Sequence, residues 1–278
     1  MSEGTPGSDE AMPLIPLAGR EVEGVLPRVL DQIRARTPAR VMVGRAGGSY
    51  RTKTSLKLRG DHAAARDAVI ADRRKNPRND LVSLLVQGTI DGEGLTDEQL
   101  LQESLLILIG GDETTRHVMT GGLEQLILHP DQKRKLIDDP GKIEIAVEEM
   151  IRWVSPIVNM NRTLTRDTVL HGEKLREGDR VLLLYPAANR DERAFENPDR
   201  FDVERWPNYH VAFGGYGVHH CLGASLARLE LKILFEELLA RLPDIRLASD
   251  EPLERRPNNF ITGIEKMPVV FTPSRASA

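Results

Sequence analysis

Residues 213–223 read Phe213-Gly214-Gly215-Tyr216-Gly217-Val218-His219-His220-Cys221-Leu222-Gly223, and they contain the only cysteine of the 278-residue chain. Beyond Cys221, apolar residues recur at the spacing of one helical face: Leu222, Leu226, Leu229, Ile233 and Leu234. The pattern places the thiol where a glycine-rich loop meets the N-terminus of an amphipathic helix. The helix dipole favours a thiolate at that end, and a thiolate is the ligand that a soft metal centre needs.

Three other interpretations of this stretch compete with a thiolate-ligated metal. A lone cysteine is most often a small buried hydrophobe, and Cys221 taken alone favours that interpretation. A zinc site is disfavoured because His219, His220 and Cys221 are contiguous and no second ligand pair follows at zinc spacing. The glycines do not form a phosphate loop, since the pattern G-x-x-x-x-G-K-[ST] is absent.

The complete string resembles the heme-binding signature of the cytochromes P450, F-G-x-G-x-H-x-C-x-G. Phe213 lies one residue farther from Cys221 than in the signature, as if a glycine had been inserted at Gly214-Gly215. The resemblance implies heme b with the Cys221 thiolate as axial ligand of the iron, and His219 as a partner of a heme propionate. It also implies that further residues of the loop bind the cofactor, namely Phe213, Gly215, Gly217 and Gly223.

Composition narrows the class of protein. Hydrophobic residues make up 40% and charged residues 29% of the chain, which is ordinary for a soluble globular protein. The net charge of −4 does not favour nucleic acid or an anionic membrane as a partner, and one cysteine fits a reducing cytoplasm. No run reaches the roughly 18 apolar residues of a membrane span, and Met1–Gly4 does not begin a signal peptide. We therefore expect a cytoplasmic protein without a membrane span.

Residues 1–60 stay unassigned and are predicted to be partly disordered. The first twelve residues are typical of a disordered tail, and Val22–Ile33 could form a short helix. Between Gln32 and Gly60 there are eight basic residues and no acidic one, a pattern that can mark a nucleic-acid patch. Tyr50 is the only aromatic residue there and no motif accompanies it, so a solvated segment is the favoured interpretation.

From Asp61 onward, helical patterns dominate. Residues 61–88 predict two helices broken at Asn76-Pro77, and the second helix carries an apolar stripe. Thr96, with Gln99 three residues later, is a candidate N-cap. A long helix is then expected from about Asp97 to His129, before Pro130.

That helix contains a second motif, Gly110-Gly111-Asp112-Glu113-Thr114-Thr115. Two mid-helix glycines cost about 1 kcal/mol each relative to alanine, which favours a reason for a kink or a close approach. One interpretation has Asp112 and Glu113 facing solvent while Thr114 bonds back to a helix carbonyl. The motif also resembles the distal-helix pattern of the P450 family. That resemblance implies a kinked helix over the heme, with Glu113 and Thr114 relaying protons to dioxygen.

A third motif, Glu149-Met150-Ile151-Arg152, lies on a helix expected from Ile143 to Val154. Alone it would be a surface ion pair worth about 0–1 kcal/mol. In its context it resembles the E-x-x-R helix of the family. The later stretch from Phe195 to Phe201 resembles the family's meander, which implies that Arg200 completes a buried Glu-Arg-Arg network of structural importance.

Between these motifs we expect β structure. Asn161-Arg162-Thr163 enters a strand, and Thr168–Glu173 and Arg180–Ala187 predict strands joined by a turn. Arg162 matches the family's arginine that pairs with a heme propionate, a role suited to charge-assisted hydrogen bonds. A solvated arginine is the alternative. Residues 259–264 and 269–271 resemble the closing β-hairpin beside the substrate pocket.

Taken together, residues 61–278 are identified as the C-terminal core of a bacterial cytochrome P450, mainly α with small β-sheets. The resemblance implies a monooxygenase that uses O2 as co-substrate and takes electrons from a reduced ferredoxin, itself served by an NAD(P)H reductase. Apolar residues expected around the pocket and similarity to actinobacterial steroid hydroxylases predict a lipophilic substrate, a steroid or a fatty acid. The alternative is a truncated, inactive P450 remnant that acts at most as a heme-binding or scaffold protein.

Overall fold

A computed structural model describes residues 63–90, 92–215 and 217–272, with side chains from Asp67 onward. All of these residues belong to one compact unit, Val43–Ala278. The basic N-terminal segment, the expected helix Val22–Ile33 and Tyr216 of the glycine-rich loop lie outside the described residues. The division into domains at residue 60 therefore stays a prediction.

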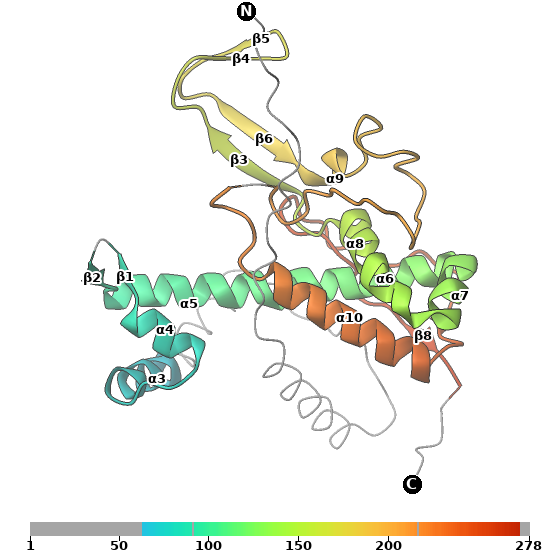
Figure 1. Ribbon diagram of the computed structural model, residues 1–278, viewed down its shortest axis with the longest axis horizontal. Helices are drawn as coiled ribbons and strands as arrows, with labels where there is room; N and C mark the ends of the chain where they lie inside the picture. Colours follow the sequence, from blue (N-terminus) through green and yellow to red (C-terminus); the bar gives the residue numbers. More distant parts are fainter. Residues whose placement is uncertain (1–62, 91, 216, 273–278) are drawn as a thin grey trace, which may run out of the picture. The chain divides into compact units, whose positions relative to one another are not determined.

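The described part is mainly helical with small two-stranded sheets, as predicted (Figure 1). Its helices are α3 (Ala63–Lys75), α4 (Leu81–Gln87), α5 (Asp97–Asp112), α6 (Thr114–Leu128), α7 (Pro130–Asp138), the 3₁₀ turn η1 (Pro140–Lys142), α8 (Ile143–Val154), α9 (Tyr185–Ala188) and α10 (Ala224–Arg241). None of the helices in the described part is both long and apolar enough to span a membrane. Its strands are β1 (Thr89–Ile90), β2 (Glu93–Gly94), β3 (Asn159–Thr163), β4 (Thr168–Leu170), β5 (Glu173–Leu175), β6 (Arg180–Leu184), β7 (Arg246–Leu247) and β8 (Val269–Val270).

Local sequence signals explain where helices begin. Asp80 caps α4 by accepting a hydrogen bond from the Ser83 N–H at 2.8 Å. Thr96 and Gln99 form a reciprocal capping box at the start of α5, which confirms the predicted N-cap. The long helix expected from Asp97 to His129 is instead two helices, because the chain breaks at Glu113.

The core forms where α6, α8 and α10 pack together (Figure 1). Gly121 and Gly122 let α6 approach α8 closely, since a Cβ atom on Gly122 would lie 2.9 Å from the Met150 sulfur. On α10 the fully buried large side chains follow a spacing of four residues: Leu231, Phe235 and Leu239. Near the start of the same helix Ala224 is buried, but Leu226 is 52% exposed, and Leu222, just before the helix, is 92% exposed. The buried stripe of α10 therefore runs through Ala224, Leu231, Phe235 and Leu239 and not through the residues that the sequence pattern indicated.

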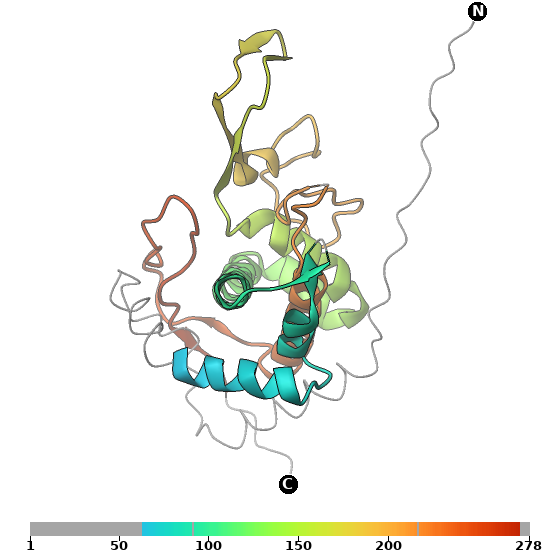
Figure 2. The same cartoon turned by 90° about the vertical axis from the view of Figure 1, so that its left-hand side faces the viewer.

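The β segments pair differently from the prediction. β3 pairs with β6, and β4 turns back at His171-Gly172, both with positive φ, to pair with β5. Figure 2 shows the β3–β6 pair continuing into the β4–β5 hairpin. The expected single strand Thr168–Glu173 was wrong, because this tight turn interrupts it. The expected strand Arg180–Ala187 ends at Leu184, because Tyr185–Ala188 forms a short helix.

The expected closing hairpin was also wrong. Val269–Val270 pairs with Arg246–Leu247 and not with residues 259–264. In that segment Ile261 instead bridges Ile157, and Ile264 bridges Arg255. The C-terminal segment thus returns to several separate parts of the chain.

Candidate functional site

The glycine-rich loop before α10 is held by its own backbone. The Cys221 N–H donates to the Phe213 carbonyl at 2.9 Å, and the Gly214 N–H donates to the Val211 carbonyl at 2.8 Å. Gly214 has φ +95°, and a Cβ atom there would lie 3.2 Å from the His219 carbonyl oxygen. Only glycine adopts this conformation without strain. The apparent inserted glycine is therefore part of a tight turn that brings Phe213 back to Cys221.

The Cys221 thiol is exposed and not in a disulfide. Its neighbours Val218 and Leu222 are 96% and 92% exposed. The interpretation of Cys221 as a small buried hydrophobe is therefore wrong. Within the described residues, no three His, Cys, Asp or Glu side chains are grouped so that they could hold a metal ion. Heme iron needs no such group, because the porphyrin supplies most of its ligands.

An ion-pair cluster anchors the loop to α8 and α10. Glu148 accepts hydrogen bonds from Arg228 at 2.6 and 2.9 Å and lies 3.1 Å from His210 Nε2. The Arg228 guanidinium lies over the Phe213 ring at 4.7 Å. Burial raises the pKa of Glu148, but the hydrogen bonds from His210 and Arg228 outweigh it and lower the pKa to about 2. Sequence reasoning missed this cluster.

A second, buried network is centred on Glu149, the residue after Glu148 on α8. Glu149 and Arg152 have fully buried side chains, and Arg152 donates to both carboxylate oxygens at 2.7 and 2.8 Å. The third member is Arg205, whose Nε lies 3.1 Å from Glu149 Oε2. The prediction of Arg200 in this position was wrong. The Arg200 side chain is 63% exposed and lies 3.8 Å from Asp202.

The break between α5 and α6 holds the second predicted motif. The Thr114 hydroxyl donates to the Gly110 carbonyl at 2.8 Å, as one interpretation of the sequence predicted. Glu113 does not face solvent, because its side chain is only 13% exposed and pairs with Arg256 at 2.6 Å and Arg116 at 3.3 Å. The pair joins the break to a segment more than 140 residues away along the chain.

Near the break, α5 presents apolar surface to solvent. Leu106, Leu108 and Ile109 are each more than half exposed. A Cβ atom on Gly110 or Gly111 would meet nothing within 4 Å. Exposed apolar side chains and open space beside glycines fit a large flat apolar cofactor, which would cover them.

The two residues predicted to bind the heme propionates, Arg162 and His219, are exposed hydrogen-bond donors. Arg162 lies on β3, and its Nη1 donates to the Asn161 carbonyl at 2.9 Å. His219 is exposed in the loop beside Cys221. No hydrogen bond among the described residues joins Arg162, His219 and Cys221 to one another. Their side chains remain accessible to a ligand that carries carboxylates.

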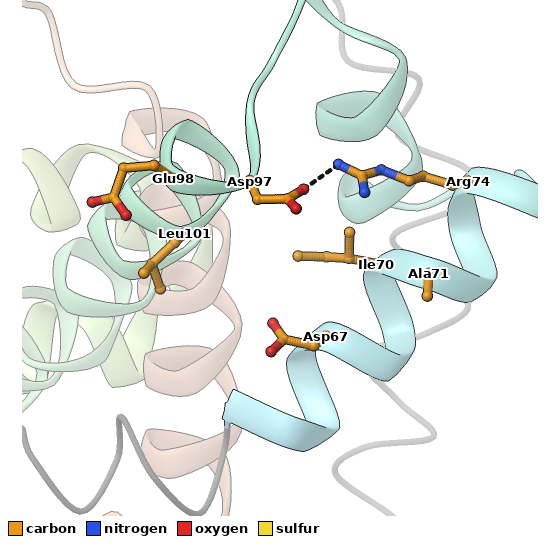
Figure 3. A pocket seen from close by; sticks show the side chains of 7 residues that line it. All are labelled: Asp67, Ile70, Ala71, Arg74, Asp97, Glu98 and Leu101. Atoms are coloured by element: carbon orange, nitrogen blue, oxygen red, sulfur yellow. Dashed lines mark hydrogen bonds and ion pairs between the residues drawn. The ribbon is translucent and has the colours of Figure 1, made fainter.

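A separate pocket lies between α3 and α5 and contains none of the predicted site residues (Figure 3). Arg74 reaches across it to pair with Asp97. Its other lining residues are Asp67, Ile70, Ala71, Glu98 and Leu101. No pattern in the sequence predicted this pocket, and none of its lining residues belongs to the loop around Cys221.

Comparison with protein families places these features in context. The family model described as Cytochrome P450 matches residues 143–266. A second model, described as Ethanolamine ammonia-lyase light chain (EutC), matches residues 27–87, of which the structure describes only residues 63–87. The first match spans the Glu149 network and the Cys221 loop.

Individual relatives support the same likeness. The steroid C26-monooxygenase of Mycolicibacterium smegmatis is 54% identical over 206 residues, which cover 74% of this chain and 51% of the relative. The methyl-branched lipid omega-hydroxylase of Mycobacterium tuberculosis is 43% identical over 218 residues, covering 78% of this chain and 50% of the relative. The chain thus spans about half the length of the curated relatives it matches.

Solved structures share the fold. The mixed-function P450 MycG matches with a TM-score of 0.74 and 38% identity, covering 81% of this chain and 57% of that one. CYP109E1 from Bacillus megaterium, solved in complex with corticosterone, matches with a TM-score of 0.73 and 31% identity. That match covers 80% of this chain and 61% of CYP109E1.

Proposed function

Because this chain belongs to the cytochrome P450 family, we propose that it is a heme-thiolate monooxygenase acting on a lipophilic substrate. In this reaction a C–H bond, O2, two electrons and two protons give a hydroxylated product and one water. The observation that carries the proposal is the exposed Cys221 thiol, at the end of a loop closed by the bond from Cys221 N–H to the Phe213 carbonyl. Heme, when bound, supplies the oxidative chemistry.

The chain's own residues bind and orient the cofactor in this proposal. The Cys221 thiolate would hold the iron, and the loop residues Phe213, Gly215, Gly217 and Gly223 would lie against the flat ring. Arg162 and His219 bind the propionates through charge-assisted hydrogen bonds. Their exposure leaves donors available for that contact.

Glu113 and Thr114 move protons in the same proposal. The Thr114 hydroxyl gives its hydrogen to the Gly110 carbonyl, so its oxygen lone pairs stay free to accept a hydrogen bond from water. Each Glu113 oxygen has more acceptor capacity than its arginine contact uses. Thr114 can therefore hold a water molecule near the Glu113 carboxylate, and Glu113, this water and the Thr114 hydroxyl would pass protons from the solvent towards the bound O2.

Electrons must come from outside the chain. We propose a reduced ferredoxin-type carrier and its NAD(P)H reductase as partners, in the cytoplasm. The single cysteine supports a reducing compartment.

The substrate is proposed to be a steroid or a fatty acid. Phe260 and Ile261 are apolar, and α5 presents Leu106, Leu108 and Ile109. The relatives named for steroid and methyl-branched lipid hydroxylation support the same class. Apolar walls bind such ligands mainly through the area removed from water.

A second candidate function has its own observation. The apolar face of α5 is exposed. A P450 remnant that binds heme without turnover, or that acts as a scaffold, would also show this feature.

The deciding experiment is the carbon monoxide difference spectrum of the reduced protein after reconstitution with heme. The proposal expects the strongly red-shifted Soret band of a thiolate-ligated heme, and Cys221→Ser should abolish it. A band at the position of histidine-ligated hemes, or no bound heme, would favour the remnant. Titration of the wild-type protein with a sterol, a methyl-branched fatty acid and a straight-chain fatty acid should then shift the Soret band for at least one of them.

A further inference from the structure

Arg256 makes two strong contacts near the break between α5 and α6. Its Nη1 lies 2.6 Å from Glu113 Oε2, and its Nε lies 2.5 Å from Glu265 Oε1. The side chains of Arg256 and Glu113 are each 13% exposed, and that of Glu265 is 22% exposed. A charge-assisted ion pair between largely buried side chains holds them in a more definite position than a solvent-exposed pair does.

Arg256 is itself fixed in a closed loop of the C-terminal segment. Its N–H donates to the Gly263 carbonyl at 2.9 Å, and its carbonyl accepts from the Asn258 N–H at 2.9 Å. The Asn258 side chain in turn accepts from the Phe260 N–H at 2.7 Å. Phe260 is thus linked to Arg256 by two consecutive hydrogen bonds, by way of Asn258.

The same segment touches α6 at a second point. Gly263 packs against the buried His117 ring so closely that a Cβ atom would lie 1.8 Å from Nδ1. His117 is one helical turn after Glu113, and its N–H donates to the Glu113 carbonyl at 2.9 Å. Both the side chain and the backbone of Glu113 are thus positioned with reference to the loop of residues 256–265.

We infer that Arg256 is a positioning residue for Glu113 and couples it to the loop that carries Phe260. The inference rests on the proposed monooxygenase function, in which Glu113 handles protons. Arg256 holds one carboxylate oxygen on the side of the C-terminal loop, while Arg116 holds the other. A substrate that displaces Phe260 would change the position of Arg256, and with it the direction in which Glu113 points.

The neighbouring arginine provides a matched control. Arg255 lies in the same segment and also anchors it to α6, with its Nη2 2.7 Å from both oxygens of Glu124. Among the described residues, no hydrogen bond or ion pair joins Arg255 to Glu113. Arg255→Gln therefore removes an anchor of the segment and leaves the Glu113 contact in place.

The first test is hydrogen–deuterium exchange of the full chain, which does not depend on heme. Arg256→Gln should speed amide exchange of residues 110–117 by about tenfold, because local opening becomes easier. Arg255→Gln should leave these amides unchanged, and Arg256→Lys should restore most of the protection. In a Glu113→Gln background, Arg256→Gln should add little further effect, since the cycle isolates the contact between the two residues.

The second test uses the reconstituted protein with its electron donors. Arg256→Gln should keep the thiolate Soret band but lower the product formed per NAD(P)H by about tenfold. With Glu113 misplaced, proton delivery is less efficient, and more NAD(P)H is oxidised without forming hydroxylated product. Arg255→Gln should not change this ratio. If the wild-type protein gives no thiolate band, the proposed function fails, and the exchange cycle alone still decides the role of Arg256.

Two results would overturn the inference. One is equal faster exchange of residues 110–117 in Arg255→Gln and Arg256→Gln, which would make Arg256 a general anchor of the segment. The other is an undiminished effect of Arg256→Gln in the Glu113→Gln background, which would show that it does not act through Glu113.

Discussion

Arg205 Nε donates to Glu149 Oε2 at 3.1 Å, and the same guanidinium binds the backbone carbonyls of Glu196, Asn197 and Arg200. One side chain thus ties the buried E-x-x-R carboxylate to the loop that follows α9. Glu149 has no exposed side-chain surface, so all of its charge must be compensated by hydrogen bonds. Arg205 and Arg152 provide the charged donors, and the Asp202 N–H and the Asn208 side-chain amide add hydrogen bonds at 3.0 and 3.1 Å.

Replacing Arg205 should therefore destabilise the protein much more than replacing Arg200. We expect Arg205→Leu to lower the free energy of unfolding by about 1–3 kcal/mol, since Glu149 loses a charged donor but keeps Arg152. Arg200→Leu should change it by less than about 0.5 kcal/mol, because that side chain is exposed. Urea denaturation monitored by circular dichroism measures both values. Equal losses in the two variants would contradict the assignment of Arg205.

The contrast between the two arginines shows what the sequence could predict. The E-x-x-R helix was predicted with the bounds Ile143–Val154 that the structure has, because its apolar period and its charge pair are local signals. Which guanidinium folds back onto Glu149 is a non-local property, since the path of the whole loop from Phe195 to Asn208 decides it. The only available signal was that Arg205 follows the apolar residues Phe201 and Val203, both buried in the structure.

The candidate site was likewise predicted only in part from the sequence. The loop motif predicted Cys221 at the start of a helix, and the back-bonding of Thr114 followed from the chemistry of a mid-helix hydroxyl. Gly110-Gly111 favoured a kink in this motif, but the apolar pattern continues across Glu113 and did not place a break there. The pairing of Glu113 with Arg256 was not predictable, because the partner lies 143 residues away. The roles of the site residues in binding heme and moving protons stay predictions.

Gly263 should not tolerate a methyl group. A Cβ atom there would overlap the His117 ring, lying 1.8 Å from Nδ1 and 2.2 Å from Cγ. Overpacking of this kind costs about 1–3 kcal/mol or more. We expect Gly263→Ala to lower the midpoint of thermal unfolding clearly, whereas Gly110→Ala, where a Cβ atom meets open space, should not. The double variant Gly263→Ala/His117→Ala should be more stable than the sum of the two single losses predicts; strict additivity would contradict the contact.

His117 should make stability depend on pH near neutrality. Burial, followed by the nearby Arg256 charge, lowers the pKa of His117 below its ordinary value of 6.5. The unfolded chain then binds a proton at pH values where the folded one does not. Stability is therefore unaffected well above pH 6.5 and falls as the pH drops below it, with a slope of at most about 1.4 kcal/mol per pH unit from this group.

The measurement for His117 is the free energy of unfolding between pH 8 and 5.5, compared with His117→Gln. The variant should show a smaller loss of stability over this interval, because its side chain does not titrate. His171→Gln serves as the control, since that histidine is exposed in the turn between β4 and β5. The same slope in wild type and His117→Gln would mean that other groups cause the dependence.

Glu148 should stabilise the Cys221 loop through its contacts with Arg228 and His210. These hydrogen bonds outweigh burial and hold the pKa of Glu148 at about 2, below its ordinary value of 4.5. A carboxylate with a lowered folded pKa contributes stability that is complete above pH 4.5 and is lost as the pH falls through about 2. We expect Glu148→Gln to cost on the order of 2 kcal/mol at pH 7, with the difference from wild type shrinking between pH 4.5 and 2.5. Glu144→Gln, on the same helix but 78% exposed, should have no such effect.

The Glu148→Gln variant should also affect heme binding, because Arg228 lies over the ring of Phe213, whose carbonyl accepts from the Cys221 N–H. Glu148→Gln should therefore lower the fraction of thiolate-type heme in the carbon monoxide spectrum, and Glu144→Gln should not. A stability loss in Glu148→Gln that stays constant down to pH 2.5 would show that the carboxylate charge is not the cause.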